Sequence, residues 1–233
     1  SMYMGAGAVK SRMLVPADFA GKKVRSMGPA ENALLGALGA NPTTMAFGDV
    51  PPALQTGVID GLLTSLGGFN QVKEQAPYFT VAGINGIVGD YYWIGASNKW
   101  WATLDKKQQA ALTDIIMNDF IPYQKAINFC NDKRLVDKFK VTDKSAPGIY
   151  VMSPSEAGVL QAKEGGATNN WIKSKVDDMG DKMVDQFTAE AKALVAANPM
   201  GSSALEKTDC TAFASDFAKF AKGTALYKKK SRK

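Results

Sequence analysis

The fold is decided by residues 18–65, which read D-F-A-G-K-K-V-R-S at 18–26 and G-A-N-P-T-T-M-A-F-G-D-V-P-P-A-L-Q-T-G-V-I-D-G-L-L-T-S at 39–65. Short apolar runs alternate here with a segment of helical periodicity, and glycine and proline separate them. The pattern predicts three strands at Lys22–Ser26, Thr43–Phe47 and Val58–Ser65. It predicts helices between them at Pro29–Ala40 and Asp49–Thr56. A strand-helix-strand-helix-strand order is typical of a parallel sheet covered by helices.

The ends of these helices carry their own signals. Pro42 disfavours helical geometry at Asn41, so the first helix is expected to stop before it. Asp49 is a suitable N-cap for the second helix, and Pro51 occupies a first-turn position where its missing N–H costs nothing. Gly57 then provides the C-terminal stop.

Four side chains fall at the carboxyl ends of the predicted strands, where folds of this type place their ligands. They are Arg25, Phe47, Thr64 and Ser65. A guanidinium is planar and always charged, and it matches a carboxylate with two parallel hydrogen bonds. The spacing leaves a second interpretation open for Arg25, that of a surface or salt-bridged arginine.

Three motifs carry a resemblance to a known family. They are G-K-K-V-R at 21–25, G-A-N-P-T-T-M-A-F-G-D-V at 39–50 and A-L-Q-T-G-V-I-D-G at 53–61. In this order they resemble the signature of the DctP-like solute-binding proteins of TRAP transporters, the tripartite ATP-independent periplasmic carriers. Weaker similarity continues through N-K-W-W-A-T-L-D at 98–105 and W-I-K-S-K-V at 171–176, up to about Asn198.

The resemblance implies a periplasmic binding protein-like α/β fold. Two lobes, each with a mixed sheet, would be joined by hinge strands and a long helix. Such a protein closes around a small organic acid in the periplasm and delivers it to a membrane permease, with no cofactor and no enzymatic step. The family's ligand-clamping arginine falls on Arg25, and its cleft-lining aromatic falls on Phe47.

The chain departs from the family's pattern at three places, one of which is the pair Pro51 and Pro52, where relatives often have an aromatic residue. Relatives continue D-G-x-E-N where this chain reads D-G-L-L-T at 60–64, so the hydroxyl of Thr64 replaces an amide. A further arginine that many relatives place upstream of Arg25 has no match, since Arg12 is too close to it. Fewer charged contacts suggest a ligand less highly charged than a dicarboxylate.

The resemblance also suggests how the chain is divided. We expect a ligand-binding second lobe at 1–90, a returning part of the first lobe at 91–130, a completion of the second lobe with back-spanning helices at 131–198, and a helix with a basic tail at 199–233. Relatives begin with a strand-helix-strand series that nothing before Met13 can supply. The first lobe is therefore expected to be incomplete and the amino-terminal part truncated.

Outside the motifs the patterns are weaker. A strand at Met13–Val15 and a helix at Phe69–Phe79 are expected. A long strand at Ala82–Ser97 would pass between lobes and offer Asn85, Tyr91 and Tyr92 as ligand contacts, although such aromatic residues also pack in cores. The remaining elements are a helix from Asn98 to Phe139 kinked at Pro122, a strand at Ile149–Met152, a capping box at Ser153–Glu156, a core-facing stripe of Trp171, Val176, Met179, Met183 and Phe187, and an amphipathic helix within Ala204–Tyr227.

Composition excludes several kinds of chemistry. The chain of 233 residues has no histidine, which removes the Ser/His/Asp and Cys/His triads. Two cysteines, Cys130 and Cys210, cannot form a four-ligand zinc site, and they are either one disulfide or two buried thiols. The formal charge is +6, but the run K-K-K-S-R-K at 228–233 carries five of the basic residues, leaving +1 for the rest. That run is either a solvated terminus or a patch for phosphates or anionic lipid.

A second function remains open beside the transport role. The same fold could serve as an interaction module that associates with another chain, or with a second copy, through the incomplete lobe. No run of 18 apolar residues is present, so the sequence predicts no transmembrane helix.

Overall fold

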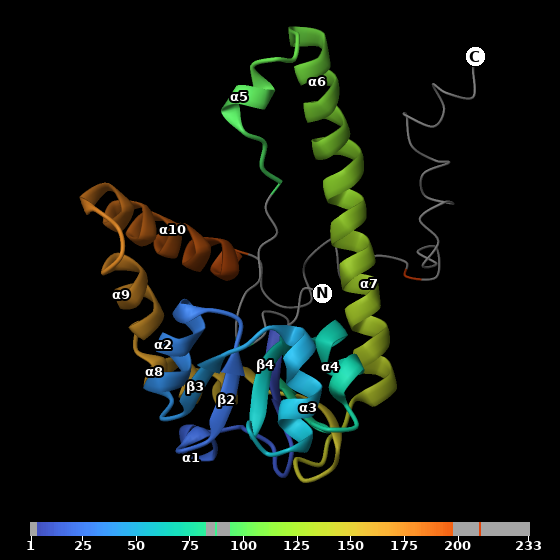
Figure 1. Ribbon diagram of the computed structural model, residues 1–233, viewed down its shortest axis with the longest axis vertical. Coiled ribbons are helices and arrows are strands. Elements are labelled where there is room, and N and C mark those ends of the chain that lie inside the picture. Colours follow the sequence, from blue (N-terminus) through green and yellow to red (C-terminus); the bar gives the residue numbers. More distant parts are fainter. Residues whose placement is uncertain (1–3, 83–86, 88–93, 198–209, 211–233) are drawn as a thin grey trace. The chain divides into compact units, whose positions relative to one another are not determined.

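A computed structural model describes residues 4–82, 87, 94–197 and 210 (Figure 1). The chain divides into two compact units. The first unit comprises Ser1–Asp90 and Asp132–Ser202, and the second comprises Tyr91–Asn131 and Ser203–Lys233.

The first unit is built on a mixed sheet. Among the described residues its strands are β1 (Met4–Ala8), β2 (Lys23–Ser26), β3 (Asn41–Thr44), β4 (Gly61–Ser65), β5 (Tyr78–Val81) and β6 (Gly148–Val151), in the order β3-β2-β4-β1-β5-β6. Strand β2 runs parallel to β3 and β4, and β5 runs parallel to β6. Strand β1 is antiparallel to β4 and β5. The predicted α/β class with a mixed sheet is confirmed.

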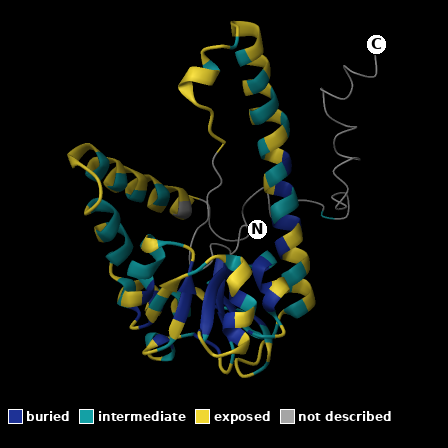
Figure 2. Ribbon diagram, in the orientation of Figure 1, coloured by how far each residue is buried: buried dark blue, intermediate teal, exposed yellow. Residues whose placement is uncertain are grey.

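Helices cover both faces of this sheet. Val24 and Leu63 pack on one face with Phe19 of α1 (Pro16–Phe19) and Leu35 of α2 (Pro29–Ala37), together with Leu160 of α8 (Pro154–Glu164). Because side chains alternate along a strand, Leu62 points to the opposite face, where it meets α3 (Val50–Gln55). Helix α4 (Leu66–Val72) packs beside it through Phe69, which stacks on Phe79 with ring centroids 4.7 Å apart. Figure 2 shows the inner strands of this sheet mostly buried, whereas most residues of the edge strand β3 are exposed.

The position of the first strand differs from the prediction. The first strand lies at Met4–Ala8 and not at Met13–Val15. Its glycines allow a very close approach to β5, because a Cβ at Gly5 would lie only 2.2 Å from the carbonyl oxygen of Thr80. Glycine is normally depleted in strands, so the sequence pattern hides this one.

Other boundaries also shift. Strand β3 ends at Thr44, and Phe47–Asp49 form a 3₁₀ turn (η1) in place of the predicted strand end. Asp49 makes no side-chain cap. The predicted helix at Phe69–Phe79 is wrong beyond Val72, because the chain turns there and enters β5.

The long predicted helix is divided. Helix α5 (Asn98–Trp101) is capped by Ser97 rather than Asn98, and α6 (Lys106–Asp114) starts at its own capping box of Asp105 and Gln108. A π-helical segment (η3, Ile115–Phe120) then leads into α7 (Ile121–Phe139). Pro122 has no N–H to donate to the preceding turn, which accounts for the wider turn just before it.

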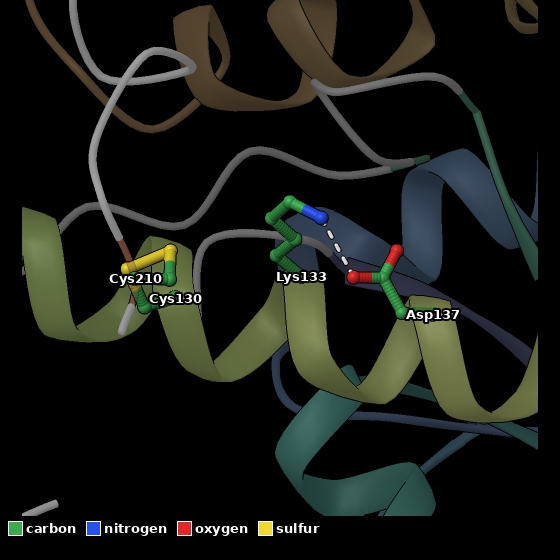
Figure 3. Close-up of a disulfide and its surroundings, with 4 residues drawn as sticks. All are labelled: Cys130, Lys133, Asp137 and Cys210. Carbon is green, nitrogen blue, oxygen red and sulfur yellow. Dashed lines mark hydrogen bonds and ion pairs between the residues drawn. A yellow bond between two sulfur atoms is a disulfide. The ribbon is translucent and has the colours of Figure 1, made fainter. Parts of the chain in front are cut away.

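A disulfide joins Cys130 on α7 to Cys210, with their Cα atoms 5.3 Å apart (Figure 3). Both residues belong to the second unit. Figure 3 also shows the ion pair one turn along α7, where the Nζ of Lys133 lies 2.6 Å from a carboxylate oxygen of Asp137. Of the two interpretations of the cysteines, the structure has the disulfide.

The predicted core stripe on the last helices is wrong. On α10 (Asp178–Ala197) the side chains of Met179 and Met183 are 71% and 65% exposed. Val176, just before the helix, and Phe187 are exposed as well. The opposite side of α10 contacts α9 (Ala167–Lys173), with a hydrogen bond from Asn169 to Thr188. Periodicity predicts that a helix has an apolar face, but it does not tell what covers that face.

Two predicted elements lie outside the described residues, namely most of the strand at Ala82–Ser97 and the helix within Ala204–Tyr227. None of the described helices combines the length and apolar character that crossing a membrane requires.

Candidate functional site

Arg25 lies at the carboxyl end of β2, on the face of the sheet that α3 and α4 cover. Its register partner in β4 is Leu62, which belongs to the apolar cluster on that face. The guanidinium is held by two backbone carbonyls: its Nε donates to the oxygen of Met45 at 2.9 Å, and Nη1 donates to that of Leu63 at 3.0 Å. The side chain therefore has a defined orientation.

The charge of Arg25 is not neutralised locally. The residue is only 5% exposed, and burial lowers the pKa of its guanidinium, while the nearby Glu31 partly opposes this shift. No carboxylate in the described part of the chain forms an ion pair with it. A guanidinium has five N–H donors, and those on Nη2 make no hydrogen bond to any described residue. A buried cation with unused donors is suited to an anion.

Phe47 lies next to this guanidinium. The Cζ atom of Arg25 is 5.8 Å from the centre of its ring. The ring comes from the 3₁₀ turn after β3 and is partly exposed. The structure thus brings Phe47 and Arg25 together, although by a turn and not by the end of a strand.

Thr64 and Ser65 occupy the end of β4 in different ways. Thr64 is 3% exposed and shares its face of the sheet with Leu62 and Arg25. Its hydroxyl makes no hydrogen bond to any described residue. The hydroxyl of Ser65 instead caps α4 by accepting the N–H of Gly68 at 3.1 Å. Of the two hydroxyls, that of Thr64 makes no hydrogen bond within the described part of the chain.

The sequence analysis missed a residue of this site. Gly68 lies against both Thr64 and Phe47, since a Cβ added to it would be 2.1 Å from Oγ1 of Thr64 and 3.3 Å from the Phe47 ring. The only sequence signal was the pair Gly67-Gly68, which is also typical of an ordinary turn. The other three predicted site residues, Asn85, Tyr91 and Tyr92, lie outside the described residues and stay predictions.

A second polar cluster lies at the same end of the sheet on the opposite face. The hydroxyl of Ser26 donates to Asn32 at 2.6 Å and lies 3.1 Å from that of Thr44. Asn32 also donates to Thr44 at 3.1 Å. These groups satisfy one another, so the cluster ties β2, α2 and β3 together. No group of three or more His, Cys, Asp or Glu side chains suited to a metal ion occurs within the described residues.

An α/β unit that holds a buried, unneutralised arginine where parallel strands end has the architecture of a small-molecule binding protein. Residues 4–165 match the model of DctP, the bacterial extracellular solute-binding protein family 7. The chain therefore belongs to this family, that of the solute-binding proteins of TRAP transporters. It is a family of transport proteins and not of enzymes. A comparison with curated proteins found no match.

Solved structures support the same fold. The periplasmic ectoine-binding protein of the TeaABC TRAP transporter of Halomonas elongata aligns with a TM-score of 0.63 at 22% identity, over 82% of this chain and 61% of its own. A TRAP solute-binding protein of Rhodoferax ferrireducens T118 with benzoate gives 0.60 at 20% identity, over 84% and 60%. One from Desulfovibrio salexigens with bound orotic acid gives 0.65 at 16% identity, over 83% and 60%. The chain thus spans about three fifths of the length of these relatives.

Proposed function

We propose that this chain is the solute-binding component of a TRAP transporter, that it works in the periplasm, and that it captures a small organic carboxylate through Arg25 for delivery to a membrane permease. The observation that carries the proposal is the buried guanidinium that two backbone carbonyls orient and that no described carboxylate neutralises. An organic carboxylate would supply the missing negative charge and accept two parallel hydrogen bonds. Relatives with bound benzoate and malonate support this class of ligand.

The roles of the other residues follow from their placement. Phe47 would cover the apolar body of the ligand, since its ring lies beside the guanidinium. Thr64 would hydrogen-bond a polar group of the ligand with its hydroxyl. With one arginine at the site, a monocarboxylate fits better than a dicarboxylate. Asn85, Tyr91 and Tyr92 are proposed to complete the cleft from the segment that joins the two units.

The lobes are proposed to follow the expected division, with the ligand lobe at 1–90 completed by 131–198, and 91–130 belonging to the other lobe. Closure around the ligand would be a hinge motion, driven by contacts that form only in the closed state. The basic tail at 228–233 has no role in this proposal.

Calorimetric titration of benzoate and malonate against the parent and Arg25→Lys tests the clamp. Lysine keeps the positive charge but loses the planar fork. Loss of one charge-assisted hydrogen bond costs about 1.5–3 kcal/mol, so the dissociation constant should rise about tenfold or more. Lys23→Ala is the matched control, because it removes an exposed cation from the same strand and should leave binding unchanged. Equal binding by Arg25→Lys and the parent would exclude the clamp.

The exposed face of α10 favours a second candidate function, self-association. Its methionines Met179 and Met183 are among the most exposed apolar side chains described. An antiparallel pair of α10 helices crossing near Gln186 would bring Lys182 of each copy opposite Glu190 of the other. Light scattering after gel filtration should then show a dimer that Met183→Asp dissociates. A monomer at all concentrations would rule this function out.

A further inference from the structure

Two consecutive glycines, Gly67 and Gly68, lie in the first turn of α4, and their surroundings differ. A Cβ at Gly67 would have its nearest neighbour, the hydroxyl of Ser65, at 3.7 Å, which is an ordinary contact. A Cβ at Gly68 would be 2.1 Å from Oγ1 of Thr64, 3.3 Å from its Cβ and 3.3 Å from Cε2 of Phe47. Only at Gly68 would a side chain collide with its neighbours.

Backbone conformation does not explain Gly68. Neither glycine has a positive φ, so both have a conformation that any residue adopts. Glycine is also the poorest helix former after proline. A glycine at this position therefore makes the helix less stable. The lack of room for a side chain next to Thr64 and Phe47 is the physical reason for a glycine here.

The two neighbours of Gly68 cannot yield equally. Thr64 is β-branched, so its side chain has few rotamers, and at 3% exposure it is packed on nearly all sides. A methyl group at position 68 would force the Thr64 side chain into another rotamer. The ring of Phe47 would need to move by only a few tenths of an ångström, but it lies beside Arg25.

We propose that Gly68 is a positioning residue of the ligand site: by lacking a Cβ it sets the rotamer of Thr64 and the place of the Phe47 ring beside Arg25. The proposal rests on the proposed function, in which these three side chains contact the ligand. It goes beyond that function by assigning the arrangement of the site to the first turn of α4.

The test compares Gly68→Ala with Gly67→Ala, two variants that exchange the same residue type in the same helical turn. The first measurement needs no ligand. In a sample with ¹³C-labelled threonine methyl groups, the Thr64 methyl signal reports its rotamer. We expect this signal to move in Gly68→Ala and to stay in place in Gly67→Ala.

The second measurement is calorimetric titration with benzoate. We expect Gly68→Ala to weaken benzoate binding about tenfold and Gly67→Ala to leave it within about twofold of the parent. An unmoved Thr64 signal together with unchanged affinity in Gly68→Ala would overturn the proposal. If benzoate binds neither the parent nor any variant, the proposed function fails for this ligand, and the methyl signal alone decides the role of Gly68.

A third variant covers the case in which Gly68→Ala does not fold. The double variant Gly68→Ala with Thr64→Ala removes the hydroxyl that the new methyl group would meet at 2.1 Å. We expect the double variant to unfold at a higher temperature than Gly68→Ala alone. A double variant that is no more stable than the single one would overturn the proposed contact.

Discussion

The sharpest stability prediction concerns Arg12, the second buried arginine of the first unit. It is 5% exposed, and its guanidinium donates to the carbonyl oxygens of Phe79, Lys144 (3.0 Å), Ala146 (2.6 Å) and Gly148 (3.2 Å). The same group lies 5.9 Å from the ring centre of Tyr78 and 5.6 Å from that of Tyr150. Arg12 thus fastens the segment before β6 to β5, and we expect Arg12→Ala to destabilise this unit strongly.

The expected loss of stability in Arg12→Ala depends on which of the four carbonyl oxygens water can reach. Lys144 is exposed and Ala146 is partly exposed, so water can replace the guanidinium at these two oxygens. Phe79 is fully buried, and its carbonyl would lose this partner. Loss of a hydrogen bond from a charged donor costs about 1.5–3 kcal/mol, and loss of the contact with the tyrosine rings adds about 1 kcal/mol. With a smaller share from Gly148, the expected loss is about 3 kcal/mol.

Urea unfolding followed by circular dichroism measures this loss. With a slope of about 2–3 kcal/mol per molar urea, the midpoint should fall by about 1–1.5 M without a change in slope. Arg12→Lys should be nearly as destabilised, because a single ammonium cannot reach four carbonyls. Lys10→Ala is the control, a cation nearby in the chain, and should shift the midpoint very little. A loss below about 1 kcal/mol in Arg12→Ala would refute this account of the guanidinium.

Three further predictions follow. Hydrogen bonds from Lys144, then from the Ser153 backbone, lower the pKa of Glu156 to about 2. The ionised carboxylate therefore stabilises the fold fully above the ordinary value of 4.5, and this stabilisation is lost as the pH falls toward 2. Glu156→Gln should differ from the parent in melting temperature at pH 7 and converge with it near pH 2. Reduction of the disulfide between Cys130 and Cys210, 80 residues apart, should lower the free energy of unfolding by up to about 4 kcal/mol in thermal or urea unfolding with and without reductant, whereas an unchanged transition would contradict it. Met183→Ser should change the free energy of unfolding of the monomer by less than about 0.5 kcal/mol, and a larger loss would mean that its side chain packs on the body of the protein.

Local signals predicted the strands around Arg25 well. The motif around Arg25 forms β2, and the strand that ends in Thr64 and Ser65 lies parallel to it. The capping box at Ser153 and Glu156 opens α8 as predicted. In each case the information lies within a few residues, because caps, turns and alternation act over one turn of helix or a few residues of strand.

Elements that depend on distant partners could not be predicted. Strand β1 has glycines that make it look like a loop, and it is a strand only because Gly5 can approach Thr80 of β5, which lies far away in the chain. Gly68 was equally hidden, since its role depends on the ring of Phe47 as well as on Thr64. The exposed methionines of α10 show the same limit. Helical periodicity predicts an apolar face, but it does not predict which surface packs against that face.

The two buried arginines of the first unit differ in how they use their hydrogen-bond donors. Both are 5% exposed, and burial lowers the pKa of both guanidinium groups. Arg12 uses its donors on four backbone carbonyls, whereas Arg25 uses two carbonyls that orient it and keeps Nη2 unused by any described residue. The donors that Arg12 uses within the fold thus have counterparts on Nη2 of Arg25 that no described residue uses and from which an anion could accept hydrogen bonds. Arg12→Lys should therefore mainly lower the free energy of unfolding, and Arg25→Lys should mainly weaken carboxylate binding. The reverse result would contradict the roles given to both residues.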